Sequence, residues 1–568
     1  MYEQVFDPVS SSLGLTAIFA ALPLVTLFVL LGAFRVTAWI SGLAALAVAI
    51  VVSILVYDVP VGQSLDMGLE GAAFGLFPIM WIVVNAVWIY NMTEKTGHFA
   101  VLRRSFATVS NDQRIQAVII AFSFGALIEG LAGFGTPVAI TTVMLLALGF
   151  SPLKAAALSL IGNTAPVAFG SIATPIVTLS AQTDIPIEDL GAMVGRQTPF
   201  LALIVPLILV GVVDGARGVR QAWPAALVAG ASFALAQFVC SNYISVELTD
   251  IIGALFSTAV LVGFLRVWKP GEPLLVEPAG GDLPAVAGAE GHNPALERSV
   301  RLRDQTTDST REKLEAYAPY IIIVLVFSIA KLVDPVEQFL FEVSGGTGFG
   351  TDDKTANGFD WPGLDVIDAD GEAPSAQTYQ FSFWDTPGTV VLLCGLLTIA
   401  ALRVNLREAA RTYGETLSQL KLAIVTVMAV LGLAYVMNLT GMTSTLGQWI
   451  AGSGGFFAFL SSIIGWLGVA ITGSDTSSNA LFGALQVEAA EKADLSAVLL
   501  ASSNSSGGVL GKMISPQNLA IAAAAVGMAG KEGDILRRVL FWSVVLTLLM
   551  CVIVYLQSTA LLDWMVVE

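Results

Sequence analysis

Charge, histidine and cysteine are all scarce in this chain. Only 12% of its 568 residues are charged, whereas roughly 25% is typical of a soluble domain. The two histidines, His98 and His292, fall in expected loops and are too few for a metal cluster. The three cysteines lie far apart in apolar segments, which argues against a disulfide framework, a metal site and a thiol nucleophile. We therefore expect neither a cofactor nor a metal.

Apolar sequence, in contrast, is abundant. Hydrophobic residues make up 55% of the chain, and many segments exceed the roughly 18 uncharged residues that indicate a membrane span. The chain is therefore predicted to be an all-α, polytopic protein of the cell membrane. Its partners are then the lipid bilayer and a small molecule, and not nucleic acid. An intramembrane enzyme is not favoured, because the sequence has no P-loop, no nucleophile elbow and no nucleophile–base pair.

Acidic residues outnumber basic ones, 44 to 27, for a formal net charge of −17. Much of this excess lies at 335–385, which we interpret as an acidic extracellular loop. A solvated acidic surface suits a salt-loving host, where screening removes the self-repulsion of the surface. A calcium loop is the alternative, but the Asp spacing does not match the EF-hand pattern.

The Lys/Arg distribution predicts how the chain is oriented. The loop that holds Lys95, Arg103, Arg104 and Arg114 is expected in the cytoplasm, which places the N-terminus outside. Alternating the spans from there places the C-terminus outside as well. The expected parts are N-terminal helices (1–70), a first repeat (71–213), connecting helices (214–334, with spans at 225–240 and 251–264 and a cytoplasmic linker at 266–315), the acidic loop (335–385), a second repeat (386–556) and a C-terminal tail (557–568).

Glycine, proline and small polar residues interrupt two apolar segments of the first repeat. The arm at 115–131 breaks at 133–137, and the next helix breaks at 163–175. Such residues normally end helices, and non-helical backbone at membrane depth is tolerated only where protein buries it or it lines a wet cavity. We therefore predict a re-entrant helical hairpin with its tip at 133–137, followed by a broken transmembrane helix.

The second half of the chain repeats this order of breaks. An apolar arm breaks at 472–479, and the following helix breaks at 504–517. The same number of positions separates Asn163 from Asn504, Gly170 from Gly511, and Pro175 from Pro516. The charge pattern gives the two halves opposite topology. Two inverted-topology repeats with broken helices are typical of secondary transporters.

Ionisable residues within membrane segments are rare and mark functional sites. Glu129, near the first tip, is a candidate proton carrier, and the alternative is a structural hydrogen bond to the tip backbone. Asp475, in the second tip, is a candidate for proton or cation binding, and the alternative is a helix N-cap. Lys512 is a candidate partner for a substrate carboxylate, for Glu129 or for Asp475, and the alternative is snorkelling to an interface. Asn85 is expected to bond between helices.

Small polar residues at the tips and breaks complete the predicted site. Broken helices present free N–H groups and half-dipoles that attract anions, and hydroxyl and amide groups add neutral donors. This combination suits a small carboxylate. The substrate-binding residues predicted on this basis are Gly133, Gly135, Thr136, Asn163, Thr164, Gly473, Ser474, Thr476, Asn504, Ser505, Ser506 and Lys512.

Four stretches resemble the lactate permease family: IEGLAGFGTP at 128–137, GNTAPVAFG at 162–170, TGSDTSSN at 472–479 and SPQN at 515–518. The resemblance covers nearly the whole chain. It implies uptake of lactate and related 2-hydroxy monocarboxylates such as glycolate, coupled to protons. It also implies the fold of the broad ion-transporter superfamily, with paired re-entrant hairpins and elevator motion. Two alternatives stay open: sodium as the coupling ion of a carboxylate transporter, and a cation/proton antiporter with Asp475 as the cation ligand.

Overall fold

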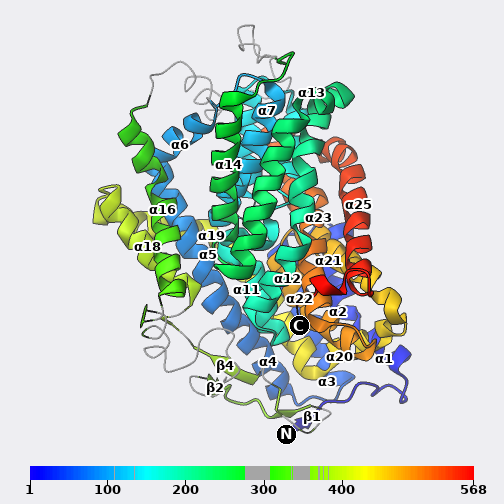
Figure 1. Ribbon diagram of the computed structural model, residues 1–568. Coiled ribbons are helices and arrows are strands. Elements are labelled where there is room, and N and C mark those ends of the chain that lie inside the picture. Colours follow the sequence, from blue (N-terminus) through cyan, green and yellow to red (C-terminus); the bar gives the residue numbers. More distant parts are fainter. Residues whose placement is uncertain are drawn as a thin grey trace.

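The structure is a computed structural model of a largely helical chain (Figure 1). Among the described residues, ten helical segments are long and apolar enough to cross a membrane, or eleven if one bent pair counts as a span. The predicted all-α polytopic fold is therefore confirmed. The described residues are 1–107, 109–133, 135–274, 308–333, 335–336, 339, 358–368, 371, 373–374, 377–381, 383–384 and 386–567.

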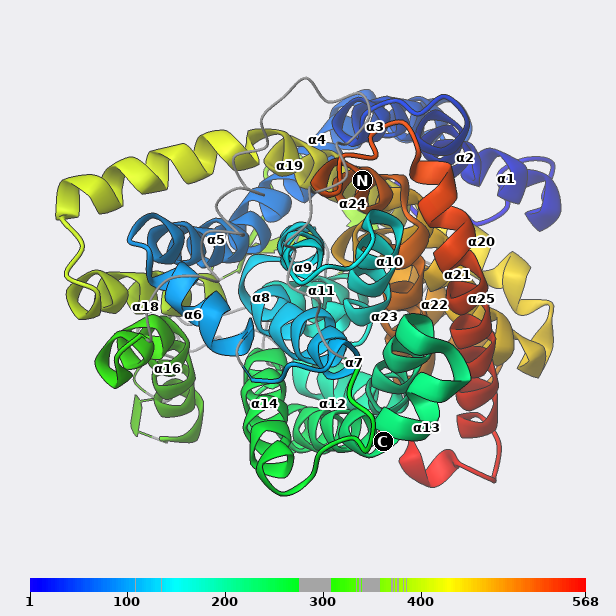
Figure 2. The same cartoon turned by 90° about the horizontal axis from the view of Figure 1, so that it is seen from above.

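An outer group of helices borders the centre of the molecule on one side, as Figure 2 shows. In this group α3 and α4 both pack along α19, and Gly71 makes the approach possible, because a Cβ there would meet the backbone of Gly432, 2.8 Å away. The outer helices are α1 (Leu13–Ala20), α2 (Leu22–Phe28), η1 (Val29–Ala33), α3 (Ala38–Leu55), α4 (Val61–Phe74), η2 (Gly75–Met80), α5 (Trp81–Lys95), α16 (Thr310–Leu332), α18 (Pro387–Ala401) and α19 (Leu406–Thr440).

The first hairpin forms where the sequence predicts it. After the short helix α6 (His98–Ala107), the descending arm consists of α7 (Gln113–Ala117), η3 (Val118–Phe124) and α8 (Gly125–Ala132). The arm α9 (Thr136–Ala147) returns and packs on both α8 and η3. Gly135 closes the tip with a φ of +83°, a conformation that favours glycine.

The first broken helix also lies where the sequence predicts it. Its parts α10 (Pro152–Gly162) and, through η4 (Val167–Phe169), α11 (Gly170–Thr183) are bent by 65° relative to each other. Ser171, Ile172 and Ala173 at the start of α11 all have a positive φ, between 48° and 57°. Left-handed backbone costs a non-glycine residue about 1–3 kcal/mol and is concentrated at functional sites.

The second half shows the same order of elements. The short helix α20 (Met442–Ala451) and the single turn η6 (Gly454–Phe456) precede the arms α21 (Phe457–Thr472) and α22 (Asp475–Lys492). Gly473, with a φ of +78°, closes the tip between the two arms. The interrupted helix consists of α23 (Ala497–Gly511), η7 (Lys512–Ile514) and α24 (Pro516–Ala525). The opposite topology of the two halves stays a prediction.

One boundary differs from the sequence prediction. The break expected over 504–517 is confined to η7 and Ser515, because α23 runs unbroken through Asn504, Ser505 and Ser506 to Gly511. The small residues there serve close packing instead. A Cβ on Gly507 would collide with the backbone of Ser462 on α21, so this stretch lets two helices touch without ending either.

Long helices and a small β structure complete the fold. The predicted span at 225–240 is joined to the end of the first repeat, 199–213, in one helix, which kinks at Asp214 and Gly215. The N-terminal strand pairs in parallel with a strand of the acidic loop. Residues 275–307 of the predicted linker and much of 335–385 lie outside the described residues. The remaining elements are α12 (Ile187–Gln197), α13 (Pro199–Tyr243), α14 (Thr249–Val267), α25 (Glu532–Gln557), η8 (Asp563–Met565), β1 (Tyr2–Glu3), β2 (Gly358–Asp360), β3 (Val366–Ile367) and β4 (Thr378–Gln380).

Candidate functional site

A cavity of about 540 Å³ lies where the two hairpin tips meet the two helix interruptions. The central elements α8, α11, α22 and α24 supply much of its wall (Figure 2). The outer group lines the remaining side, with the turn between η1 and α3 and one face of α19. The cavity reaches the surface of the molecule on that side, where Arg35 of the turn and Gln517 of α24 are exposed.

A buried ion pair joins the two halves of the chain at this cavity. Lys512 Nζ donates a hydrogen bond of 2.6 Å to Glu129 Oε1, and the side chains are 8% and 3% exposed. Burial to this degree argues against snorkelling of Lys512 to an interface. The second oxygen of Glu129, Oε2, has no hydrogen-bond partner among the described residues. Glu129 therefore does not cap the tip backbone, and one of its oxygens is free for a proton.

The backbone around the ion pair leaves room for the Glu129 carboxylate. A Cβ on Gly170, at the first break, would lie 2.7 Å from Glu129 Oε1. A Cβ on Gly133, at the first tip, would lie 3.3 Å from the same oxygen. The distance at Gly170 is too short for a real side chain, and a Cβ on Gly133 would also lie 2.5 Å from Ser171 Oγ. Glycine at these two positions therefore lets the tip and the break close around the carboxylate.

Asp475 supplies a second buried carboxylate to the wall. It is the first residue of α22, but the N-cap is Ser474, whose side chain accepts a hydrogen bond from the Ser477 N–H. Asp475 is therefore not the cap that the sequence offered as an alternative. Its Oδ2 accepts a hydrogen bond of 2.5 Å from Ser505 Oγ, and its Oδ1 has no partner within the described chain. One oxygen is held in place and the other is left for a ligand or a proton.

The structure divides the predicted substrate-binding residues into two groups. Around the cavity it brings together Gly133, Gly473, Ser474, Thr476 and Lys512, with Glu129 and Asp475. It does not place the remaining residues in the wall, namely Gly135, Thr136, Asn163, Thr164, Asn504, Ser505 and Ser506.

Contacts between helices account for several residues of the second group. Asn504 Nδ2 donates to Asn479 Oδ1 at 2.9 Å, which ties α23 to α22. Ser506 Oγ donates to Gln197 Oε1 at 2.6 Å, which ties α23 to α12. Ser505 acts on the cavity indirectly, because it holds Asp475. Buried hydrogen bonds of this kind stabilise helix packing in membranes.

Several residues of the wall were not predicted. Ser171 of the left-handed turn and Thr174 directly after this turn line the cavity. Arg35 and Gln517 line the side where the cavity reaches the surface. The repeat pattern offers a signal for Ser171, because it occupies the position in the first half that Lys512 occupies in the second. The left-handed turn itself has no sequence signal, since none of its three residues is glycine or asparagine.

Other sequence predictions concern residues away from the cavity. Asn85 joins helices as expected: its Nδ2 donates to the Gly388 carbonyl at 3.0 Å, and its Oδ1 accepts from Tyr413 at 3.1 Å. The three cysteines are free and buried. Within the described residues, no three His, Cys, Asp or Glu side chains lie close enough together to hold a metal ion.

The chain matches known proteins over almost its whole length. A family model described as L-lactate permease matches residues 16–561. The L-lactate permeases of Bacillus subtilis (strain 168) and Escherichia coli (strain K12) are 38% and 39% identical, each over 572 residues that cover 100% of both chains. The glycolate permease GlcA of Escherichia coli (strain K12) is 39% identical over 564 residues, 98% of each chain. The Alcanivorax borkumensis YdaH transporter, a solved structure, covers 86% of both chains at 12% identity, and its TM-score of 0.40 is too low to carry an argument.

Proposed function

Because the chain belongs to the L-lactate permease family, we propose that it imports lactate and related 2-hydroxy monocarboxylates such as glycolate by proton symport. The relatives are named as permeases, so the expectation of a transporter and not an enzyme is confirmed. The observation that carries the proposal is the buried pair of Lys512 and Glu129 in the wall of a cavity large enough for a small acid and water. The substrate and the coupling ion follow from the chemistry of this pair.

Lys512 supports the binding of a carboxylate. A lysine ammonium is a compact positive charge with three N–H donors, and Glu129 takes one of them. A substrate carboxylate that enters the cavity competes with Glu129 for this charge. A buried charge is stable only with a partner, so Lys512 pairs with Glu129 when the site is empty and with the substrate when it is full.

Glu129 supports coupling to protons. When the substrate takes over Lys512, an ionised Glu129 is left without a partner in a buried site, which is strongly unfavourable. Protonation of Glu129 removes that charge. The loaded site then holds one proton and one carboxylate more than the empty site, and its net charge is unchanged. Proton and substrate therefore stabilise each other in the site, which is the thermodynamic requirement for symport.

Asp475 supports a preference for 2-hydroxy acids. Ser505 orients the carboxylate, and the free Oδ1 can accept a hydrogen bond from the substrate hydroxyl. The hydroxyl groups of Ser171, Ser474 and Thr476 offer further partners in the same wall. A site that is built to bond a hydroxyl discriminates strongly against an acid that lacks it, because its buried polar groups are then left unpaired.

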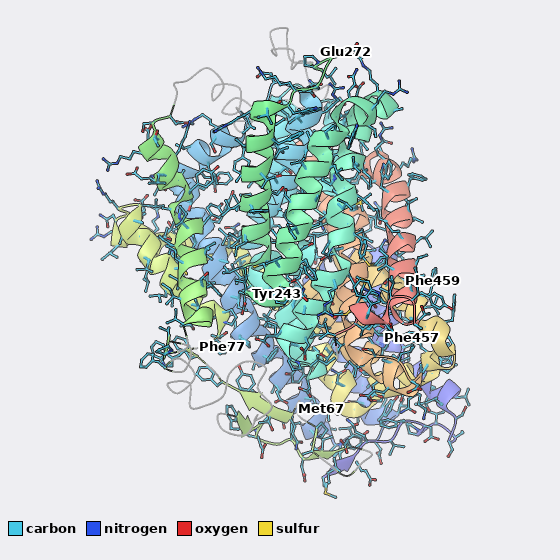
Figure 3. The ribbon with its side chains drawn as sticks, in the orientation of Figure 1. Met67, Phe77, Tyr243, Glu272, Phe457 and Phe459 are labelled. Carbon is cyan, nitrogen blue, oxygen red and sulfur yellow. The ribbon has the colours of Figure 1, made fainter. Side chains whose placement is uncertain are left out.

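With the orientation predicted from the Lys/Arg distribution, the cavity of this conformation opens toward the cytoplasm. Glu272, which bonds Arg217 beside Arg114, lies at one end of the molecule in Figure 3, and the N-terminus lies at the other end in Figure 1. The first end carries the basic residues that predict a cytoplasmic side. The N-terminal strand pairs with the acidic loop, as expected if both lie outside. Arg35 follows the first span, so an outside N-terminus would place Arg35 on the cytoplasmic side, and Arg35 lines the cavity where it reaches the surface.

Counterflow in proteoliposomes tests the proposal. Vesicles that hold the purified protein and unlabelled lactate are placed in labelled lactate, with a pH gradient or a sodium gradient imposed separately. We expect counterflow without any gradient, and accumulation driven by an inward proton gradient alone. Accumulation driven only by sodium would assign sodium as the coupling ion, and sodium flux that does not depend on lactate would favour an antiporter. Glycolate as a competitor tests the range of substrates.

A further inference from the structure

Asp250 is a buried carboxyl beside the ion pair that the sequence prediction did not include. It lies in the first turn of α14 and its exposed fraction is 0%. A Cβ added to Gly130, the residue after Glu129, would lie 3.3 Å from the Cβ of Asp250. The residues that line the cavity include none from α13 or α14. Asp250 therefore packs on the residue that follows Glu129, and it does not line the cavity.

Helix capping does not explain this carboxyl. A carboxylate in the first turn of a helix is normally held by the free N–H groups of that turn. Neither oxygen of Asp250 accepts a hydrogen bond from any residue that the structure describes. A buried carboxylate without a partner is so unfavourable when ionised that it takes up a proton instead. Asp250 is therefore the neutral acid of the cluster while Glu129 holds Lys512.

The charges around Asp250 support this assignment. Within the described part of the chain, Lys512 is the cation whose charge acts on Asp250, and Glu129 already pairs with Lys512. The helices η3 and α11 also pack on α14, and neither contains an ionisable side chain. Helix α16 contacts α14 as well, and its buried ionisable side chain is Tyr320, a neutral phenol. The ionisable groups whose charges or dipoles act on Asp250 are Glu129 on α8, Lys512 on η7 and Cys240 on α13, and Cys240 is also acted on by Glu247 before α14.

The packing of α13 against α14 places a buried polar side chain, Gln237, between Asp250 and the first helix break. Ser257 of α14 donates to the Ala229 carbonyl of α13 at 2.8 Å, and Gly253 packs on Phe233. Continuing this antiparallel register by one turn places Gln237 level with Asp250. Gln237 Nε2 donates to the Ala165 carbonyl in the break at 3.4 Å, and its Oε1 has no partner in the described part of the chain.

The turn between α13 and α14, which precedes Asp250 in the chain, lies close to the surface of the molecule. Tyr243, at the end of α13, is 71% exposed, and in Figure 3 it lies well away from the end marked by Glu272. The turn contains Ser245, which donates to Glu247 at 2.6 Å. Buried Ser245 and Glu247 therefore lie in the chain between exposed Tyr243 and Asp250, and Asp250 packs on the residue that follows Glu129.

We propose that Asp250 is a second proton-binding residue of the transport cycle, which exchanges the coupling proton with Glu129. This step rests on the proposed symport function. The proton leaves a carboxyl oxygen of Asp250 and passes by way of water to the free Oε2 of Glu129, because these oxygens are not hydrogen-bonded to each other in this conformation. Glu129 then becomes neutral and releases Lys512 to the substrate carboxylate. Asp250, now ionised, takes a new proton from the side of the α13–α14 turn. One proton therefore enters with each carboxylate, and the charge of the cluster is restored.

Asp250→Asn tests the proposal, because it keeps the shape of the side chain and removes the titratable group. Lactate counterflow without a gradient reports binding and the conformational cycle, whereas uphill uptake reports proton coupling. We expect counterflow within about twofold of wild type and a loss of accumulation of about tenfold or more, the size of typical coupling between sites. The pH dependence of uptake should flatten as well. Ser257→Ala, on the same helix, is the matched control and should leave both assays unchanged.

Two results would overturn the proposal. The first is wild-type accumulation and pH dependence in Asp250→Asn. The second is an equal loss of counterflow and accumulation, which marks a structural role. If Asp250→Asn does not fold, Asp250→Glu carries the test, since it keeps the carboxyl but displaces it: accumulation should slow more than counterflow, and equal slowing would contradict the proposal. Loss of lactate counterflow in the wild-type protein would refute the proposed function itself, so the two failures are distinguishable.

Discussion

Lys512 from the second half of the chain donates a 2.6 Å hydrogen bond to the carboxylate of Glu129 from the first half, and both side chains are buried. The two residues come from parts of the chain that the predicted repeat sets side by side, but they do not occupy equivalent positions. The helical framework is thus alike in both halves, while the charges are distributed asymmetrically between them.

Glu129→Gln should abolish proton-driven accumulation and leave exchange. Glutamine keeps the size of the side chain and cannot carry the proton, whereas Lys512 remains free to bind the substrate carboxylate. Uphill uptake and counterflow of labelled lactate in the same vesicles measure the two properties. Uphill uptake that survives this change would remove Glu129 from the coupling mechanism.

Lys512→Gln should lower stability and abolish counterflow. Removing one partner of a buried ion pair leaves the other charge uncompensated and costs about 3–5 kcal/mol. The double variant Glu129→Gln/Lys512→Gln removes both charges and should recover most of the thermal stability of the purified protein, but not transport. If the double variant is as unstable as Lys512→Gln, or if either variant retains counterflow, the pair does not have the role that we assign to it.

Asp475→Asn should weaken the preference for lactate over propionate, which lacks the 2-hydroxyl group. The free Oδ1 of Asp475 is the proposed acceptor for that hydroxyl, and the change replaces a carboxylate with an amide that can present an N–H instead. We expect the ratio of the two inhibition constants in lactate counterflow to fall by about tenfold or more. Ser505→Ala, which only releases the carboxylate, should have a smaller effect in the same direction. An unchanged ratio in Asp475→Asn would exclude Asp475 from hydroxyl recognition.

Gly507→Ala should destabilise the protein, since the new methyl group would collide with the Ser462 backbone. Overpacking of this kind costs typically 1–3 kcal/mol, and backbone cannot move aside as a side chain does. Gly455→Ala is the control, because that residue is exposed and a Cβ there meets nothing within 4 Å. The measurement is the melting temperature of both variants in detergent. Equal melting temperatures would contradict the close packing of α21 and α23.

Much of this architecture could be predicted from residues that act locally. Glycines such as Gly135 and Gly473, both with positive φ, close the hairpin tips where the sequence places them. Proline and glycine also mark the first helix break. These residues restrict or free the backbone whatever surrounds them, so their effect can be deduced without knowing the neighbours.

The rest depended on partners that are distant in the sequence. Asn504, Ser505 and Ser506 suggest a break, but they lie within α23 because other helices accept their side chains and pack against the adjacent glycines. Asp250 was not predicted, because it precedes the span expected at 251–264 and was therefore expected in a loop. Only the packing of α14 on α8 shows that it is buried beside Glu129.

The central claim is that a proton on Glu129 accompanies each carboxylate that Lys512 binds. The most direct test follows the internal pH of proteoliposomes with a trapped dye, while an inward lactate gradient is imposed without sodium and without a pH gradient. The wild-type protein should acidify the interior as labelled lactate enters, and Glu129→Gln should exchange lactate with no acidification. Acidification by Glu129→Gln, or lactate entry through the wild-type protein without protons, would contradict this claim.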